Sequence, residues 1–146
     1  MLRAYSAANE DAAIELWRRT WQAAYPQIDF SARLAWWRER WRTELVPTTE
    51  IVIAESGDEI AGFVTVDPKT GYLDQIVVAP EFWGSGAASV LLAEAMRISP
   101  LRLDIRVNQD NARAIHFYKK NGFVIIGEDT NPNSGAPLYK MNWQKS

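Results

Sequence analysis

The chain has 146 residues, of which 47% are hydrophobic and 23% charged, and its net charge at pH 7 is −2. This composition predicts one soluble globular domain over residues 1–146. The nearly balanced charge argues against a nucleic-acid-binding protein, and no stretch approaches the roughly 20 apolar residues that span a bilayer. With no cysteine and one histidine, the sequence excludes disulfides and thiolate metal sites, and we expect no metal. The start of the chain lacks the apolar run of a signal peptide, so we expect a cytoplasmic protein.

The N-terminal third is predicted to be helical after one short strand at 2–5. Apolar residues at helical spacing predict a helix over 9–24. A second helix is expected to start at Asp29 and to be closed by Pro47. Its apolar face consists of Leu34, Trp37, Trp41 and Leu45.

The middle of the chain has the pattern of β structure. Two β-rich runs at 51–55 and 60–67 are separated by a short turn, and a third run at 72–78 follows a second turn. Strands joined by such short turns form an antiparallel meander.

The C-terminal half alternates helices and strands. The predicted elements are a helix at 86–97, a strand at 101–107, a helix at 110–121 and a strand pair at 123–127 and 138–143. The strand–helix–strand unit at 72–107 should form a right-handed crossover between parallel neighbours. The fold class is therefore α/β (α+β), with a mixed, mainly antiparallel central sheet of about seven strands and helices on both faces.

A loop of small residues between a strand and a helix is the first chemical signal. The strand stops at Pro80, and the small residues Gly84, Gly86, Ala87 and Ala88 leave the backbone bare at the start of the next helix. Free N–H groups at a helix N-terminus suit a phosphate or pyrophosphate. The alternative is a plain strand-to-helix turn, since the segment is neither a Walker loop nor Gly-x-Gly-x-x-Gly.

A second signal lies in the helix at 110–121. Asn111, Ala114 and Tyr118 follow one another at spacings of three and four, which places them near one helical face, with Phe117 beside them. An amide and a phenol near a phosphate loop offer a hydrogen-bond partner and a proton donor. Alternatively, Tyr118 only packs under the sheet with its hydroxyl satisfied.

Together these two stretches resemble the GNAT superfamily of acyl-coenzyme-A-dependent N-acyltransferases, over about residues 48–127. The first family signature, Val-x-Pro-x-x-Arg/Gln-x-x-Gly-x-Gly/Ala, corresponds to the segment from Val78 to Ala88. Here Trp83 replaces the usual Arg/Gln, and Ser85 stands where a basic residue is common. The second signature, Asn-x-x-Ala-x-x-Phe/Leu-Tyr-x-x-x-Gly-Phe, is matched by Asn111, Ala114, Phe117, Tyr118, Gly122 and Phe123.

The resemblance implies how acetyl-CoA would be bound and used. The backbone at 76–78 would pair with the pantetheine arm where the fourth and fifth strands splay apart, and the loop amides would hold the pyrophosphate. Tyr118 would act as general acid for the departing thiolate. The implied coenzyme-binding residues are Ile76, Val77, Val78, Trp83, Gly84, Ser85, Gly86, Ala87, Ala88, Asn111, Phe117 and Tyr118.

The loop departs from the family by having no cationic side chain, which predicts weaker coenzyme binding. Arg113, Lys119 and Lys120 of the neighbouring helix could supply this charge. Alternatively, they form only the solvated face of that helix.

The general base and the acceptor amine are less clearly marked. Asp74 is the single acid within 72–78, and it shares the strand parity of Ile76 and Val78. It is the candidate base, the alternative being an ordinary polar strand residue. Trp36, with Arg33, Arg40 and the loop at 25–30, lines either an acceptor pocket or the interface of a homodimer.

We expect the acceptor to be a primary amine of a small molecule, attacked directly in a ternary complex. A protein or peptide acceptor is the close alternative. A coenzyme-binding module without catalysis is a further alternative, because the loop lacks a cation and the base is uncertain.

Overall fold

The computed structural model describes residues 1–145. Short 3-10 turns at Ala7–Asn9, Phe30–Arg33 and Pro80–Phe82 precede helices α1, α2 and α4, and a π-helical turn at Trp41–Leu45 joins α2 to α3. The strands and α-helices are β1 (Leu2–Ala4), α1 (Glu10–Ala24), α2 (Leu34–Arg40), α3 (Val46–Thr48), β2 (Glu50–Ser56), β3 (Glu59–Val66), β4 (Leu73–Val78), α4 (Ala87–Ile98), β5 (Arg102–Asn108), α5 (Ala112–Lys120), β6 (Val124–Thr130) and β7 (Pro137–Gln144).

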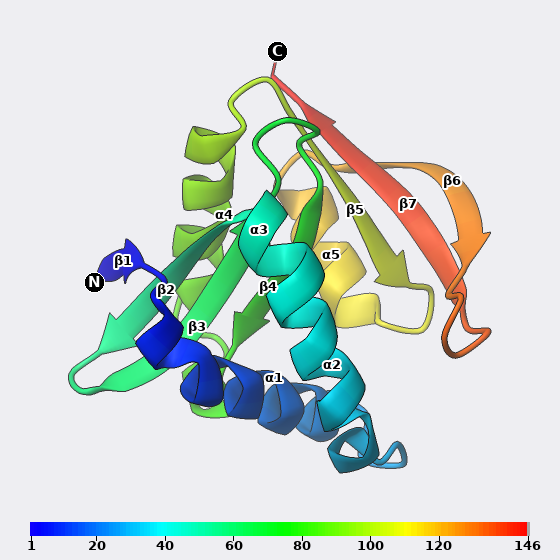
Figure 1. Cartoon of the computed structure of the whole chain (residues 1–146). Helices are drawn as coiled ribbons and strands as arrows, with labels where there is room; N and C mark the ends of the chain where they lie inside the picture. Colours follow the sequence, from blue (N-terminus) through cyan, green and yellow to red (C-terminus); the bar gives the residue numbers. More distant parts are fainter. Residues whose placement is uncertain (146) are drawn as a thin grey trace.

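The first four strands form one antiparallel sheet in the order β1-β2-β3-β4. The register places Ile53 opposite Phe63 and Phe63 opposite Val77, which confirms the predicted meander. Helices α1 and α2 cover one face of this sheet and α4 covers the other (Figure 1). The predicted fold class, a mixed sheet structure with helices on both faces, is confirmed.

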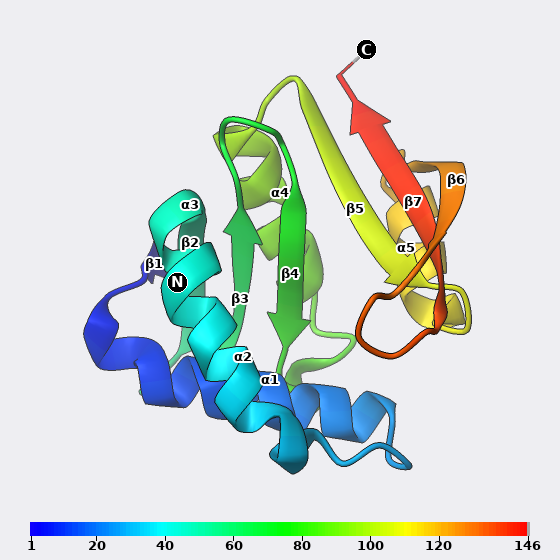
Figure 2. The same ribbon diagram turned by 45° about the vertical axis from the view of Figure 1, so that its right-hand side comes forward.

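The expectation of one continuous sheet is corrected, because the last three strands form a second sheet in the order β5-β7-β6. Tyr72, the residue before β4, forms an isolated parallel bridge with Asp104 of β5, and the two strands then diverge toward their C-terminal ends (Figure 2). The reason lies in β7, which pairs with β5 from Arg102 to Asn108. Strand β5 therefore follows β7 rather than β4, and the crossover through α4 ends beside β4 without a ladder.

Two hydrophobic clusters hold these layers together. One lies between the sheets and helices α4 and α5 and includes Leu91, Tyr118 and Met141. The other lies between the first sheet and helices α1 and α2, where the rings of Trp17 and Trp37 stack 4.5 Å apart. The tryptophans at helical spacing are thus core residues, and Trp36 lies off that line with 44% of its surface exposed.

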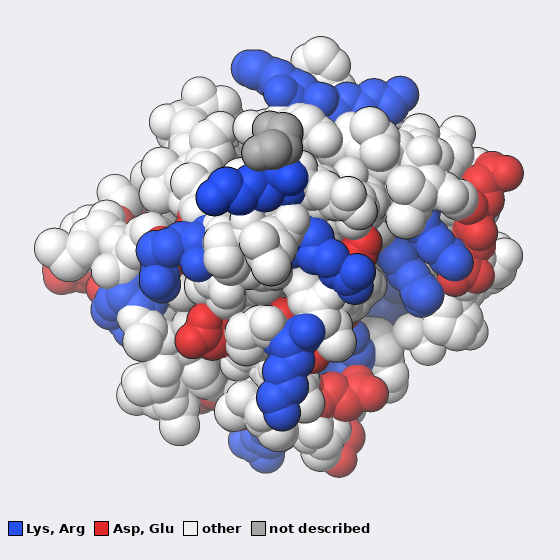
Figure 3. Space-filling model, turned by 90° about the horizontal axis from the view of Figure 1, so that it is seen from above, with Lys and Arg blue, Asp and Glu red and all other residues white. Residues whose placement is uncertain are grey.

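Several predicted boundaries shift when tertiary contacts are formed. The second helical segment continues through a π-helical turn and ends at Thr48, so Pro47 lies inside its last turn rather than after it. The C-terminal hairpin is longer than predicted, since Thr130 already pairs with Pro137. No α-helix within residues 1–145 is long and apolar enough to cross a membrane. On the face seen in Figure 3, Lys and Arg side chains are interspersed with Asp and Glu.

Candidate active site

The glycine loop between β4 and α4 leaves open space in front of the N-terminus of α4. Gly86 precedes the first residue of α4 with φ +93°, and Gly84 has φ +81°, conformations that favour glycine. A Cβ built at either position meets no heavy atom within 4 Å. Gly86, the N-cap residue, has no side chain, and the Ser85 hydroxyl oxygen accepts from the Ala87 N–H at 3.4 Å. The loop therefore presents backbone N–H groups and the positive end of the helix dipole to open space, as an anion site requires.

The remaining loop residues, Ser85, Ala87 and Ala88, make contacts that hold the start of α4 against the sheet. The Ser85 hydroxyl donates to the Phe82 carbonyl at 2.6 Å, which turns it back toward the 3-10 turn. Ala87 and Ala88 are half-buried and pack on the hydrophobic cluster beneath α4. Small side chains at these positions bring the helix close to the sheet and keep its N-terminus clear.

Trp83 fills the place of the expected basic residue and is anchored in the loop. Its indole Nε1–H donates to the carbonyl oxygen of Val78 at 2.8 Å. The guanidinium carbon of Arg113, from the first turn of α5, lies 4.2 Å from the centroid of the Trp83 ring. This cation–π contact links α5 to the loop.

The backbone of β4 presents polar groups to the divergence between the sheets. The Ala79 N–H donates to the Ala61 carbonyl of β3 at 2.8 Å, and hydrogen-bonded residues alternate along an antiparallel strand. Ile76 and Val78 therefore direct their N–H and C=O groups away from β3, toward β5. Val77 differs from these two: its backbone faces β3 and its side chain packs under α1 and α2.

Asn111 caps α5 rather than lying inside it. Its side-chain oxygen accepts from the Ala114 N–H at 3.2 Å. The helix therefore begins at Ala112, the residue after Asn111, rather than at the predicted residue 110. The Asn111 side-chain NH₂ group forms no hydrogen bond within residues 1–145 and is free to donate to a ligand. Phe117 packs against the cluster beneath α4 and α5 and contacts the ring of Tyr118 edge to face.

Tyr118 lies at the inner face of α5, with 7% of its surface exposed. Its ring packs edge to face on Phe123 at 5.2 Å. The hydroxyl forms no hydrogen bond to any group in residues 1–145, and it is not among the buried unpaired polar atoms of these residues, so its donor is available to a ligand. Burial, and secondarily the charge on neighbouring Tyr72, raises the pKa of Tyr118 above its ordinary value. The phenol therefore keeps its proton at neutral pH and is able to donate it.

Asp74 faces helix α2, contrary to the expectation from strand parity. A β-bulge opposite Thr65 and Val66 breaks the alternation of β4, so that Leu73 and Ile76 both contact the cluster beneath α4. The Asp74 side chain, 9% exposed, instead accepts from the Arg40 guanidinium at 2.8 and 2.5 Å and from the Gln75 amide at 3.1 Å. The hydrogen bond to Asp74 raises the pKa of Arg40 further, so this guanidinium stays charged.

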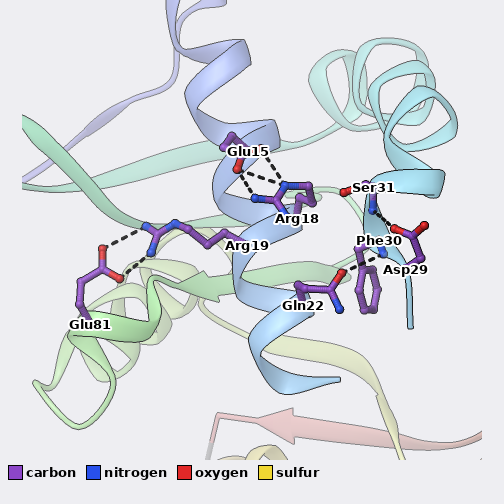
Figure 4. A network of polar contacts seen from close by, with 8 residues as sticks. All are labelled: Glu15, Arg18, Arg19, Gln22, Asp29, Phe30, Ser31 and Glu81. Atoms are coloured by element: carbon purple, nitrogen blue, oxygen red, sulfur yellow. Dashed lines mark hydrogen bonds and ion pairs between the residues drawn. The ribbon is translucent and has the colours of Figure 1, made fainter. Parts of the chain in front are cut away.

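The loop between α1 and α2 is held beside the ends of the diverging strands. The Gln22 side chain donates to the Ile28 carbonyl at 2.5 Å and accepts from the Phe30 N–H at 3.2 Å. Figure 4 shows Gln22 and Phe30 in this arrangement, and it also shows Arg19 of α1 reaching Glu81 of the segment after β4. Both ends of the candidate site are thus tied to α1.

One contact crosses from this loop to β5. The Tyr25 hydroxyl donates to Asp110 at 2.9 Å and accepts from the Asn108 amide at 3.2 Å. Burial, and then the interaction with Asp110, raises the pKa of Tyr25. The sequence gives no signal for this link or for the Gln22 contacts, because loop residues carry no periodicity that predicts a distant partner.

Two sheets that diverge beside an open helix N-terminus fit the class that the comparisons show, an N-acetyltransferase that uses acetyl-CoA. Residues 10–123 match the family model described as the acetyltransferase (GNAT) family, and the chain belongs to this family. The resemblance found in the sequence is thereby confirmed.

Similar proteins support the same assignment. Peptidyl-lysine N-acetyltransferase YjaB of Salmonella typhimurium is 27% identical over 88% of this chain and 86% of that protein. Spermidine N(1)-acetyltransferase of Escherichia coli is 36% identical over 37% of this chain and 32% of its own length. The crystal structure of PaiA N-acetyltransferase from Thermoplasma acidophilum in complex with coenzyme A has a TM-score of 0.77 and 21% identity, and covers 99% of this chain and 98% of that one. This structure shows the shared fold.

Proposed function

We propose that this protein transfers an acetyl group from acetyl-CoA directly to a primary amine in a ternary complex. The single observation that carries the proposal is the Tyr118 hydroxyl: its residue is nearly buried, the hydroxyl forms no hydrogen bond within residues 1–145, and it is not among the buried unpaired polar atoms of these residues. A phenol at the accessible edge of the core, with its donor unused, can reach a reacting group bound there. The absence of cysteine agrees with direct attack, since it removes the most reactive nucleophile for a covalent route.

The chain offers a distinct group for each part of the coenzyme. The N–H groups of Gly84, Gly86 and Ala88 would hold the pyrophosphate, since the space in front of Gly84 and Gly86 is open; the Ser85 and Ala87 N–H groups already donate to the Phe82 carbonyl and the Ser85 hydroxyl. The outward backbone groups of Ile76 and the Val78 N–H would pair with the pantetheine arm, since the Val78 carbonyl already accepts from Trp83. The Asn111 amide would add a donor. Bound acetyl-CoA supplies the acetyl group as a thioester, and a β4 N–H would polarise the thioester carbonyl.

Two side chains would move protons. Tyr118 would donate its proton to the departing sulfur, as its raised pKa permits at neutral pH. Asp74 would accept a proton from the attacking amine through water. A carboxylate has about four lone-pair sites, and Arg40 and Gln75 occupy three of them, which leaves one for this task.

The comparisons favour a lysine side chain as the acceptor. The match to the peptidyl-lysine N-acetyltransferase spans most of both chains. The match to the spermidine N(1)-acetyltransferase spans 37% of this chain, and it supports a small-molecule polyamine as the second candidate. Both acceptors are primary amines, so the chemistry proposed for Tyr118 and Asp74 is the same for either.

The test is the release of free thiol from acetyl-CoA in the presence of lysine-containing peptides, lysine-free peptides acetylated at the N-terminus, and spermidine. We expect release with the lysine peptides and not with the lysine-free control. Release with spermidine alone would reverse the acceptor assignment. Tight coenzyme binding without thiol release on any amine would instead support the non-catalytic module.

A further inference from the structure

We infer that Arg113 supplies the cationic side chain that the glycine loop lacks, and that it binds a phosphate group of coenzyme A from a position set by Trp83. The inference rests on the proposed function, because it assumes that the loop binds this coenzyme. It concerns a residue outside the loop itself.

The geometry of the stacked pair is the first observation. The Arg113 guanidinium carbon lies 4.2 Å from the Trp83 ring centroid, well inside the roughly 6 Å over which a ring attracts a cation. The hydrogen bond from the indole to the Val78 carbonyl fixes the ring. The Trp83 ring is therefore held in place, and the exposed Arg113 guanidinium lies over this ring, next to Gly84 in the loop.

The second observation is that the guanidinium is left with its donors unused. A guanidinium carries five N–H donors in its plane, and stacking engages its face rather than these donors. Nine of the other ten arginines pair with carboxylates, as Arg19 does with Glu81 and Arg40 with Asp74. Arg33, which lies over the Phe30 ring far from the glycine loop in sequence, has no ion pair within residues 1–145. Within residues 1–145, Arg113 has no ion pair. The planar, positively charged donors of Arg113 are thus available to an anion.

The position on the helix separates Arg113 from the other two basic residues of α5. Arg113 is the second residue of the helix, whereas Lys119 and Lys120 are its last two. At 1.5 Å per residue the lysines start about 9–10 Å farther along the axis, at the end away from Trp83. Of the three basic residues of α5, we therefore take Arg113 as the candidate phosphate ligand and the two lysines as the solvated end of the helix.

The group that fits these donors is a phosphate, because planar guanidinium donors pair two-fold with phosphate oxygens. Trp83 occupies the position where the family signature has Arg or Gln. The cationic side chain thus comes from Arg113 of α5 instead of from the loop, and Trp83 holds it in place. Replacing Trp83 by Arg would set two cations side by side and remove the ring that holds Arg113, so it should not tighten binding.

The test is calorimetric titration of the full chain with coenzyme A, comparing wild type, Arg113→Ala and the matched control Lys120→Ala. We expect Arg113→Ala to weaken binding about tenfold, the usual size of one lost charge-assisted contact. Its binding should also depend less on salt. Lys120→Ala should bind as wild type does. Trp83→Ala should weaken binding severalfold, and its effect should not add to that of Arg113→Ala in the double variant.

Repeating the titrations with 3′-dephospho-coenzyme A identifies the phosphate. A loss in Arg113→Ala that persists assigns the pyrophosphate, and a loss that vanishes assigns the 3′-phosphate. Equal affinity of wild type and Arg113→Ala, or an equal loss in Lys120→Ala, overturns the inference. If wild type itself does not bind coenzyme A, the proposed function fails instead.

Discussion

The Arg40 guanidinium grips both carboxylate oxygens of Asp74, with contacts of 2.8 and 2.5 Å. The pair joins helix α2 to strand β4 at the point where the two sheets begin to separate. Asp74 is nearly buried and Arg40 is a quarter exposed, so the contact is screened less than a surface ion pair. It serves both the packing of α2 and the placement of the proposed proton acceptor, and these two roles can be separated.

Comparing Asp74→Asn with Arg40→Gln separates them, because both substitutions break the ion pair and only the first removes the carboxylate. We expect both to lower stability by about 1–3 kcal/mol, as for other hydrogen bonds to charged groups. Asp74→Asn should also lower kcat by about 10²-fold or more, while Arg40→Gln keeps most of the turnover. Steady-state kinetics and denaturant unfolding provide the two measurements. Equal turnover in both variants would remove Asp74 from the proton transfer.

The phosphate loop is tested by Gly86→Asp, with Gly135→Asp as its control. Both glycines have positive φ, and at both an added Cβ meets nothing within 4 Å, so each variant carries a similar backbone cost of about 1–3 kcal/mol. Only Gly86 precedes α4. Acetyl-CoA should raise the melting temperature of wild type and of Gly135→Asp by mass action, and not that of Gly86→Asp. A folded Gly86→Asp variant that responds fully would exclude the loop as the site.

Local sequence patterns predict those parts of the fold that depend on local interactions. The alternation in 51–78 predicts the β2-β3-β4 meander, and the spacing of Trp17, Trp37 and Trp41 predicts their burial. The divergence of β4 from β5 has no local signal, because it depends on the pairing of β5 with β7, whose paired residues lie 30 or more positions apart.

The site residues show the same division. The motifs mark Gly86, Asn111 and Tyr118 because their spacing is fixed by one loop and one helix. Strand alternation predicts the wrong orientation for Asp74, because a β-bulge in the pairing of β3 with β4 turns its side chain to the other face of the sheet. Arg113 meets Trp83 across 30 residues of chain, and the partner of a surface arginine is set by tertiary packing rather than by its neighbours in sequence.

Gln22 is predicted to control the acceptor side of the site through the loop that it holds. Gln22→Leu keeps the side-chain size but removes the hydrogen bonds to the Ile28 carbonyl and the Phe30 N–H. We expect the KM for the acceptor to rise severalfold, because a looser loop costs more to order on binding. Coenzyme affinity should not change. A fall in coenzyme affinity with an unchanged acceptor KM would show that the loop serves the coenzyme and not the acceptor.

Tyr118→Phe removes the proposed general acid while keeping the ring that packs on Phe123. The expected fall in kcat is about 10²–10⁴-fold, with little change in coenzyme affinity, since the lost contact is made in the transition state. Stability should hardly change because the hydroxyl has no partner in residues 1–145. Tyr25→Phe is the contrasting control, as it loses hydrogen bonds to Asp110 and Asn108 and should melt earlier. Unchanged turnover of Tyr118→Phe would remove this phenol from the mechanism.

The raised pKa of Tyr118 also makes a prediction about stability in alkali. In the unfolded chain the phenol loses its proton near pH 10, whereas burial and the nearby Tyr72 keep it protonated to higher pH in the folded chain. Below pH 10 both states are protonated and stability does not depend on this group. Above pH 10 the unfolded state releases the proton first, so the free energy of unfolding falls as pH rises, by up to about 1.4 kcal/mol per pH unit.

Tyr72 and Tyr25 also have raised pKa values, so the measurement is the difference between wild type and Tyr118→Phe in denaturant unfolding at pH 8 to 11. The variant should lose stability less steeply above pH 10, and parallel curves for the two proteins would contradict the raised pKa.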